Sequence, residues 1–171
     1  MAEATTVTAL PPLARFVVRG GEAAISAMGS AIGVELPRQA CRAAEEGSRA
    51  ALWRGPDEWL LIASDRERDA IELYLNSVTA VASGSAVDVS DRQVGIAIAG
   101  DNAAEALNAF MPLDLDPAAF PVGMCTRTIF GKAEIVLWRR GPRSFHIEVW
   151  RSFAPYVLAC LGEALLEEGL A

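Results

Sequence analysis

His146 is the only histidine of this 171-residue chain, and it lies between Ser144 and Glu148 in the segment SFHIEVW, residues 144–150. Serine, histidine and carboxylate are the residue types of a hydrolytic triad. Alternate residues of a strand share a face but lie about 6.6 Å apart, whereas a nucleophile and its base need heavy atoms within about 3 Å. We therefore interpret His146 as a half-exposed strand residue rather than a catalytic base. A single histidine also excludes any site that needs two histidine side chains.

The segment FGKA, residues 130–133, resembles the end of a phosphate-binding loop but departs from that motif at both ends. Thr126 stands where the first glycine of such a loop belongs, and Ala133 stands where a serine or threonine belongs. The chain also contains no Gly-x-Gly-x-x-Gly sequence, the fingerprint of dinucleotide binding. We therefore expect no nucleotide or flavin site in this chain.

Asp114 and Asp116 in PLDLDP, residues 112–117, could suggest a metal loop, but the spacing of a calcium loop is missing. An acidic turn that caps a helix is the favoured interpretation. The cysteines Cys41, Cys125 and Cys160 are odd in number and widely spaced among apolar neighbours, which is typical of buried thiols rather than disulfides. We therefore expect no metal site and a reducing compartment.

Basic side chains gather in the last third of the chain. Between Val122 and Phe153 six basic residues stand against two acidic ones, a local excess of four positive charges in a chain of net charge −7. This segment is either a solvated sheet edge protected by charge or a docking surface for an acidic partner or a polyanionic ligand. Arginine and aromatic residues are typical of interface hot spots. The predicted partner interface comprises Trp138, Arg139, Arg140, Arg143 and Phe145.

Strands and helices must position these side chains, and hydrophobic spacing predicts their order. In the first half it predicts a strand at 13–18, a helix at 22–33, strands at 39–44, 49–55 and 58–63, and a helix at 66–76 capped by Asp65. In the second half it predicts strands at 85–90 and 94–100, a helix at 102–111, strands at 123–129, 134–140 and 144–150, and a helix at 153–169.

The two halves share one phrase, written LWRGPDEWLLI at 52–62 and LWRRGPRSFHI at 137–147. Two copies are too few for a solenoid, which needs at least three units. We therefore predict an α+β fold built from a duplicated strand-helix-three-strand-helix unit. A flexible arm is expected at 1–12, and a single compact domain at 13–171 with halves at about 13–80 and 81–171. The alignment pairs Gly20 with Gly100, Arg42 with Arg127, Trp53 with Trp138, Gly55-Pro56 with Gly141-Pro142, and Trp59 with Phe145.

The composition limits the class of protein. A hydrophobic content of 52% is enough for a sizeable core, and the net charge of −7 opposes binding to nucleic acids and to anionic membrane surfaces. No run of residues approaches the roughly 20 apolar positions of a membrane helix, and the first residues lack the pattern of a signal peptide. We expect a cytoplasmic protein without a nucleic-acid or membrane partner.

Four segments, taken in order and with their spacing, resemble one known family over the chain from about Leu13 onward. They are LWRGPDEWLLI, VDVSDRQVGIAIAGDNAAEALN, PLDLDPAAFPVG and FHIEVWRSFAPYV. Together they are similar to the gamma subunit of heterotetrameric sarcosine oxidase. That family in turn resembles the folate-binding domain of the glycine-cleavage aminomethyltransferase, whose fold is a duplicated α+β unit of two ferredoxin-like halves. Such relatives usually carry Gly-Pro where this chain has Gly100-Asp101.

The resemblance implies a non-catalytic gamma subunit that supports assembly of a complex with alpha, beta and delta subunits. That complex would demethylate sarcosine oxidatively to glycine, produce peroxide and pass the one-carbon unit to tetrahydrofolate. FAD, FMN, NAD and tetrahydrofolate would belong to the partner subunits. Two alternatives stay open: a free-standing folate-binding or one-carbon-transfer protein, and an accessory module of another N-methyl amino acid demethylase.

Overall fold

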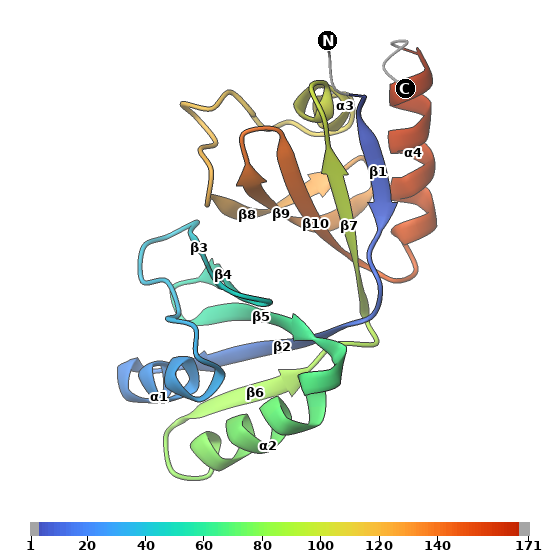
Figure 1. Cartoon of the computed structure of the whole chain (residues 1–171). Coiled ribbons are helices and arrows are strands. Elements are labelled where there is room, and N and C mark those ends of the chain that lie inside the picture. The colour runs from blue at the N-terminus through green and yellow to red at the C-terminus, as the bar shows by residue number, and fades with distance from the viewer. Residues whose placement is uncertain (1–3, 168–171) are drawn as a thin grey trace. The chain divides into compact units, whose positions relative to one another are not determined.

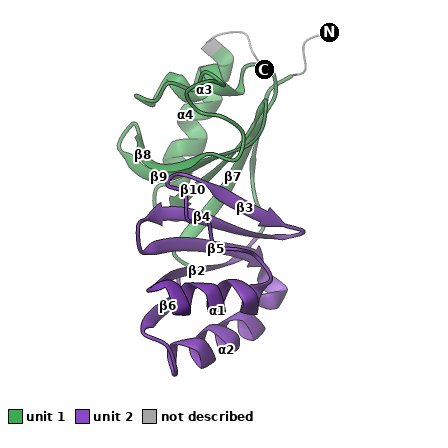
Figure 2. Cartoon of the chain, turned by 90° about the vertical axis from the view of Figure 1, so that its left-hand side faces the viewer, with its two compact units in different colours: residues 1–11, 91–171 green, residues 12–90 purple. Residues whose placement is uncertain are grey.

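The computed structural model describes residues 4–167 and divides into two compact units (Figures 1 and 2). Unit 2 is the continuous segment 12–90, whereas unit 1 combines residues up to 11 with those from 91 onward. Each unit is an antiparallel five-stranded sheet with two helices packed on one face. The predicted duplicated α+β fold is therefore confirmed.

Unit 2 has the ferredoxin-like strand order with one added edge strand, because its sheet runs β3-β4-β5-β2-β6. The predicted strands and helices are present, with β3 a few residues later than expected and Asp65 opening a 3₁₀ turn ahead of the second helix. The elements are β2 (Leu13–Gly20), α1 (Glu22–Ile32), β3 (Ala43–Glu46), β4 (Arg49–Gly55), β5 (Glu58–Ser64), the turn Asp65–Glu67, α2 (Arg68–Thr79) and β6 (Gly84–Asp88).

The core of unit 2 lies between its sheet and its two helices. Trp59, Leu61 and Ala63 alternate along β5 and pack with the apolar stripes of α1 and α2. The indole nitrogen of Trp59 donates a hydrogen bond of 2.8 Å to the carbonyl of Pro37, so its one polar atom is satisfied. Period-two alternation therefore defines which face of the strand meets the helices.

Unit 1 repeats this plan with the strand order β8-β9-β10-β7-β1. Phe145, Ile147 and Val149 of the central strand pack in one cluster with apolar side chains of the two helices. The elements are β1 (Thr6–Ala9), β7 (Gln93–Ala99), α3 (Ala103–Asn108), β8 (Cys125–Phe130), β9 (Ala133–Gly141), β10 (Ser144–Trp150) and α4 (Ala154–Glu167).

The fifth strand of each sheet does not follow the boundaries that the sequence predicts. Where a flexible arm is expected at 1–12, Thr6–Ala9 form β1 and pair with β7, Thr6 lying opposite Ala99. The strand expected to open the second half pairs with β2 instead and closes the sheet of unit 2 as β6. An edge strand needs only one neighbour, so its sequence carries little information about which sheet it joins.

The repeated hairpins contain a one-residue offset that sequence alignment conceals. Trp53 lies opposite Trp59 on β4 and β5, whereas the residue opposite Phe145 on β9 is Arg139, and Trp138 lies opposite His146. Trp53 is therefore the structural counterpart of Arg139, not of Trp138. The additional arginine in LWRRG shifts the phrase by one residue, and one residue exchanges the two faces of a strand.

We predict that Gly100→Ala strongly destabilises unit 1, because the residues leading into β1 pass directly over this glycine. Gly100 has φ +135°, and a Cβ atom there would lie 2.4 Å from Cα of Thr5. The expected loss in the free energy of unfolding is about 3 kcal/mol, measured by urea denaturation.

The matched control is Gly162→Ala in the middle of α4, where an added Cβ would meet nothing within 4 Å. This change should raise stability by about 0.5–1 kcal/mol, since alanine favours a helix over glycine. A Gly100 variant as stable as the wild type would contradict the close docking of β1.

Candidate functional site

His146 and Glu148 form a buried pair on the central strand of unit 1. The imidazole Nε2 lies 2.7 Å from a carboxylate oxygen of Glu148, and the two residues are 4% and 1% exposed. The expectation of a half-exposed histidine is therefore wrong. The two residues are two positions apart on the strand, and the long Glu148 side chain spans that spacing and reaches the ring.

The surroundings of this pair are aromatic and closed. Trp138 lies opposite His146 across the β9–β10 ladder, with the two ring centres 5.8 Å apart. Glu148 lies opposite Gly95 on one side and Val136 on the other. A carboxylate beside a histidine can hold that ring in one tautomer, but catalysis also requires a nucleophile or substrate within reach. The three hollows described below are lined by other residues.

Arg139 is 3% exposed, and its guanidinium is engaged with the backbone. It donates hydrogen bonds to the carbonyl oxygens of Leu115 (3.0 Å), Phe120 (2.8 Å) and Pro142 (2.6 Å), and it lies 5.0 Å from the ring centre of Phe145. Arg139 therefore ties the segment between α3 and β8 to the β9–β10 turn. A buried cation with three carbonyl acceptors is a structural clamp.

The remaining predicted interface residues divide by exposure. Trp138 and Phe145 are buried, whereas Arg140 and Arg143 are exposed at the β9–β10 turn. The guanidinium of Arg140 lies 4.9 Å from the ring centre of Trp138, and Arg143 forms an ion pair with Asp101. Accessible surface in the predicted set is therefore concentrated on the two arginines.

Unit 2 holds a charge cluster that the sequence did not reveal. Glu58 accepts a hydrogen bond of 2.8 Å from Nε of Arg19, and Arg54 lies 3.4 Å from its other oxygen. The hydrogen bond with Glu58 raises the pKa of the Arg19 guanidinium above its ordinary value. The three residues come from β2, β4 and β5, so only the strand order brings them together.

Asp88 at the end of β6 is a half-buried charge of unit 2. Burial alone would raise the pKa of this carboxyl, but hydrogen bonds from Ser90 and from Arg68 (2.6 Å) outweigh burial and lower it. A carboxyl with a lowered pKa in the folded state adds stability at neutral pH, which is lost as the pH falls through that value. Asp88, Ser90 and Arg68 therefore form a structural contact in unit 2.

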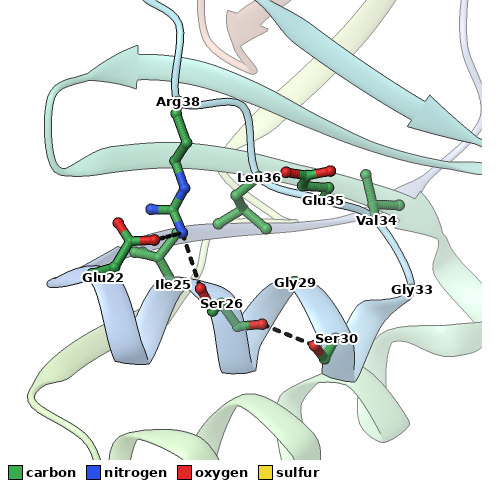
Figure 3. Close-up of a pocket in the computed structure, with 10 residues that line it drawn as sticks. All are labelled: Glu22, Ile25, Ser26, Gly29, Ser30, Gly33, Val34, Glu35, Leu36 and Arg38. Atoms are coloured by element: carbon green, nitrogen blue, oxygen red, sulfur yellow. Dashed lines mark hydrogen bonds and ion pairs between the residues drawn. The ribbon is translucent and has the colours of Figure 1, made fainter.

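Figure 3 shows a candidate binding hollow in unit 2, a surface depression of about 500 Å³ beside α1. Its cation, Arg38, points across the hollow to Glu22 at 2.8 Å and to the Ser26 hydroxyl at 3.1 Å. These two partners already engage the guanidinium of Arg38. The rest of the lining combines small and apolar residues, Ile25, Gly29, Gly33, Val34 and Leu36, with the polar side chains of Ser30 and Glu35.

Two further hollows have similar volumes. One lies at the start of α1 beside Arg19, Asp57 and Ser85, and one lies in unit 1 beside Gly100 and Arg143. Across residues 4–167, no group of three or more histidine, cysteine or acidic side chains is placed to hold a metal ion. Within the same range no helix is long and apolar enough to cross a membrane. None of the three cysteines forms a disulfide; Cys125 and Cys160 are buried as expected, whereas Cys41 is only half-buried, contrary to the expectation.

Comparison of the fold with solved structures indicates the class of protein. The chain of an aminomethyltransferase T of the glycine cleavage system from Bartonella henselae superposes with a TM-score of 0.72 at 12% identity, covering 94% of this chain and 46% of that one. At this identity the likeness concerns the fold alone. The chain therefore has the aminomethyltransferase-type fold of two ferredoxin-like halves.

Closer relatives define the family. The model of the sarcosine oxidase, gamma subunit family matches residues 19–167. The sarcosine oxidase subunit gamma of Corynebacterium sp. (strain P-1) is 32% identical over 149 residues, which span 86% of this chain and 72% of the relative. A chain of the heterotetrameric sarcosine oxidase from Corynebacterium sp. U-96 superposes with a TM-score of 0.91 at 29% identity, covering 100% of this chain and 88% of that one. This chain belongs to the sarcosine oxidase gamma subunit family.

We predict that His146→Ala destabilises the fold, because it opens a cavity beside Trp138 and removes a hydrogen-bonding partner of a buried carboxylate. The expected loss in the free energy of unfolding is about 3 kcal/mol. Urea denaturation followed by tryptophan fluorescence measures it.

Ser144→Ala is the matched control, since Ser144 begins the same strand on the same face but is only half-buried. Its stability should change by less than about 0.5 kcal/mol. Equal stability of the His146 variant and the wild type would show that the buried pair contributes nothing to folding.

Proposed function

We propose that this chain is the gamma subunit of a heterotetrameric sarcosine oxidase and supports assembly of that complex. The observation that carries the proposal is the superposition over its whole length with a chain of such a complex, at a TM-score of 0.91. The buried His146–Glu148 pair and the Arg139 clamp agree with it, because both use potentially reactive side chains in structural contacts.

The reaction itself is proposed for the partner subunits. In this proposal the complex resides in the cytoplasm, demethylates sarcosine oxidatively to glycine and passes the one-carbon unit to tetrahydrofolate. FAD, FMN, NAD and tetrahydrofolate are held by the alpha, beta and delta chains. The gamma chain contributes by binding another folded subunit of the complex. A subunit that binds only the folded state of its partner stabilises that state by mass action.

A folate-binding function of the isolated chain is the second candidate, motivated by the aminomethyltransferase fold. The strand-helix junction where these relatives usually have Gly-Pro is Gly100-Asp101 here, and Asp101 is held in an ion pair by Arg143. An accessory role in another N-methyl amino acid demethylase is the third candidate. Binding to tetrahydrofolate and to oxidase subunits separates the three.

Co-expression with the neighbouring alpha, beta and delta subunits tests the proposal. The chain should co-elute with a flavin-bearing complex in gel filtration, while the isolated chain should purify colourless and give no heat on titration with tetrahydrofolate. Within the complex, a His146→Ala variant that assembles should keep turnover within a few fold, whereas loss of a general base costs roughly 10²–10⁴-fold. Tight folate binding by the isolated chain, or failure of the wild type to co-elute, would overturn the assembly role.

We further propose that the β9–β10 turn faces the large subunit, with Arg140 and Arg143 as its accessible cations. The double variant Arg140→Glu, Arg143→Glu should slow association about tenfold or more at low salt, with a smaller effect at high salt, because rim charges act on the association rate. Stopped-flow or biolayer measurements give the rate, and the melting temperature of the isolated chain serves as the control. An unchanged association rate at low salt would contradict the proposal and would mean that Arg140 and Arg143 lie on a solvated sheet edge.

A further inference from the structure

Four exposed residues form a compact patch where β10 passes into α4. We name Arg92, Trp150, Arg151 and Phe153 the Trp150 patch. Trp150 is 47% exposed and Phe153 is 39% exposed, and both arginines are exposed as well. The four tryptophans of the chain all lie in the described range, and Trp150 is the one in the exposed class. Large aromatic side chains bury much area when they are covered, so an exposed one is a candidate contact.

Backbone hydrogen bonds hold the Trp150 patch in one arrangement. The amide of Arg151 donates to the carbonyl of Arg92 at 2.8 Å, and the amide of Phe153 donates to the carbonyl of Trp150 at 2.8 Å. The Nε of Arg151 donates to the carbonyl of Asp91, also at 2.8 Å. With the backbone fixed in this way, the conformational entropy lost on binding is confined to the side chains of the patch.

The side chains of the Trp150 patch indicate what kind of surface would bind it. The guanidinium of Arg92 lies 5.6 Å from the ring centre of Trp150, which keeps the cation beside the indole face. Two guanidinium groups stand here against one neighbouring carboxylate, that of Asp91, so the spot keeps a positive excess in a chain of net charge −7 and can pair with carboxylates. Tryptophan and arginine are the residues most enriched in interface hot spots. The matching surface is an apolar hollow rimmed by aspartate or glutamate.

We propose that the Trp150 patch is the affinity-determining contact with another polypeptide of the oxidase complex, whose surface offers an apolar hollow with acidic residues around it. This inference rests on the proposed function, because that function supplies the partner. The patch and the β9–β10 turn lie at opposite ends of β10, about 20 Å apart at strand spacing. One standard interface is wide enough to include both.

The two ends of β10 then have different kinetic roles. Exposed arginines at the β9–β10 turn act on association, whereas a buried indole acts on dissociation. Trp150→Ala in the full chain should therefore raise the Kd for the complex of the other subunits at least about 30-fold, mainly through faster dissociation. Arg92→Glu should raise it about tenfold, with a dependence on salt.

Tyr74→Ala is the matched control, since Tyr74 is an aromatic residue of α2 that is 55% exposed. This variant should bind as the wild type does. Biolayer interferometry with the purified complex of the alpha, beta and delta subunits measures both rates, and the melting temperature of each variant confirms its fold.

The outcomes separate this inference from the proposed function. Wild-type binding with a large, Trp150-specific loss supports both. Wild-type binding that Trp150→Ala leaves within threefold, or that Tyr74→Ala weakens equally, overturns the patch and leaves the proposed function standing. Absence of wild-type binding overturns the proposed function and the patch with it. Self-association of the isolated chain that Trp150→Ala abolishes would identify a second copy as the occupant and also overturn the inference.

Discussion

The register of the central hairpin in each unit is the constraint on which the rest of the fold depends. Because side chains alternate across a strand, pairing Trp53 with Trp59 and Arg139 with Phe145 decides which residues meet the helices. The same pairing decides that His146 and Glu148 occupy the other face. Both hairpins carry the same register shift beside the Gly-Pro turn, so the additional residue of the second copy displaces β9 by one position and places Arg139, not Trp138, opposite Phe145. The core, the clamp and the buried pair all follow from this alignment.

The sequence predicted the order of nearly all helices and strands, because apolar spacing is local information. It also predicted the duplication, since the phrase around Trp53 and Trp138 is visible without coordinates. It failed where the answer depends on distant residues: β1 and β6 are short edge strands whose partners no local pattern specifies. It also failed at Arg139, whose burial follows from three carbonyl groups supplied by two other segments.

The same contrast applies to the candidate site. The residue types of Ser144, His146 and Glu148 suggested a triad, whereas the spacing along a strand argued against one. In the structure His146 and Glu148 are in contact, but both are buried. A buried ionisable pair can persist for structural reasons when its groups satisfy one another. Family membership agrees with such a reading, because a subunit of a larger assembly can contribute through its surface rather than through a reaction centre. The surface of unit 1 is accordingly more informative than its buried polar groups.

The N-terminal strand has a consequence for the order of events during synthesis. Thr6 and Ala99, partners in the β1–β7 ladder, are 93 residues apart, and the whole of unit 2 lies between them. A ribosome therefore releases β1 before the whole of unit 2, and only afterwards delivers β7, the strand with which β1 pairs. Until then β1 has no partner strand. An entire compact unit of the chain must be synthesised before the ladder between β1 and β7 can form.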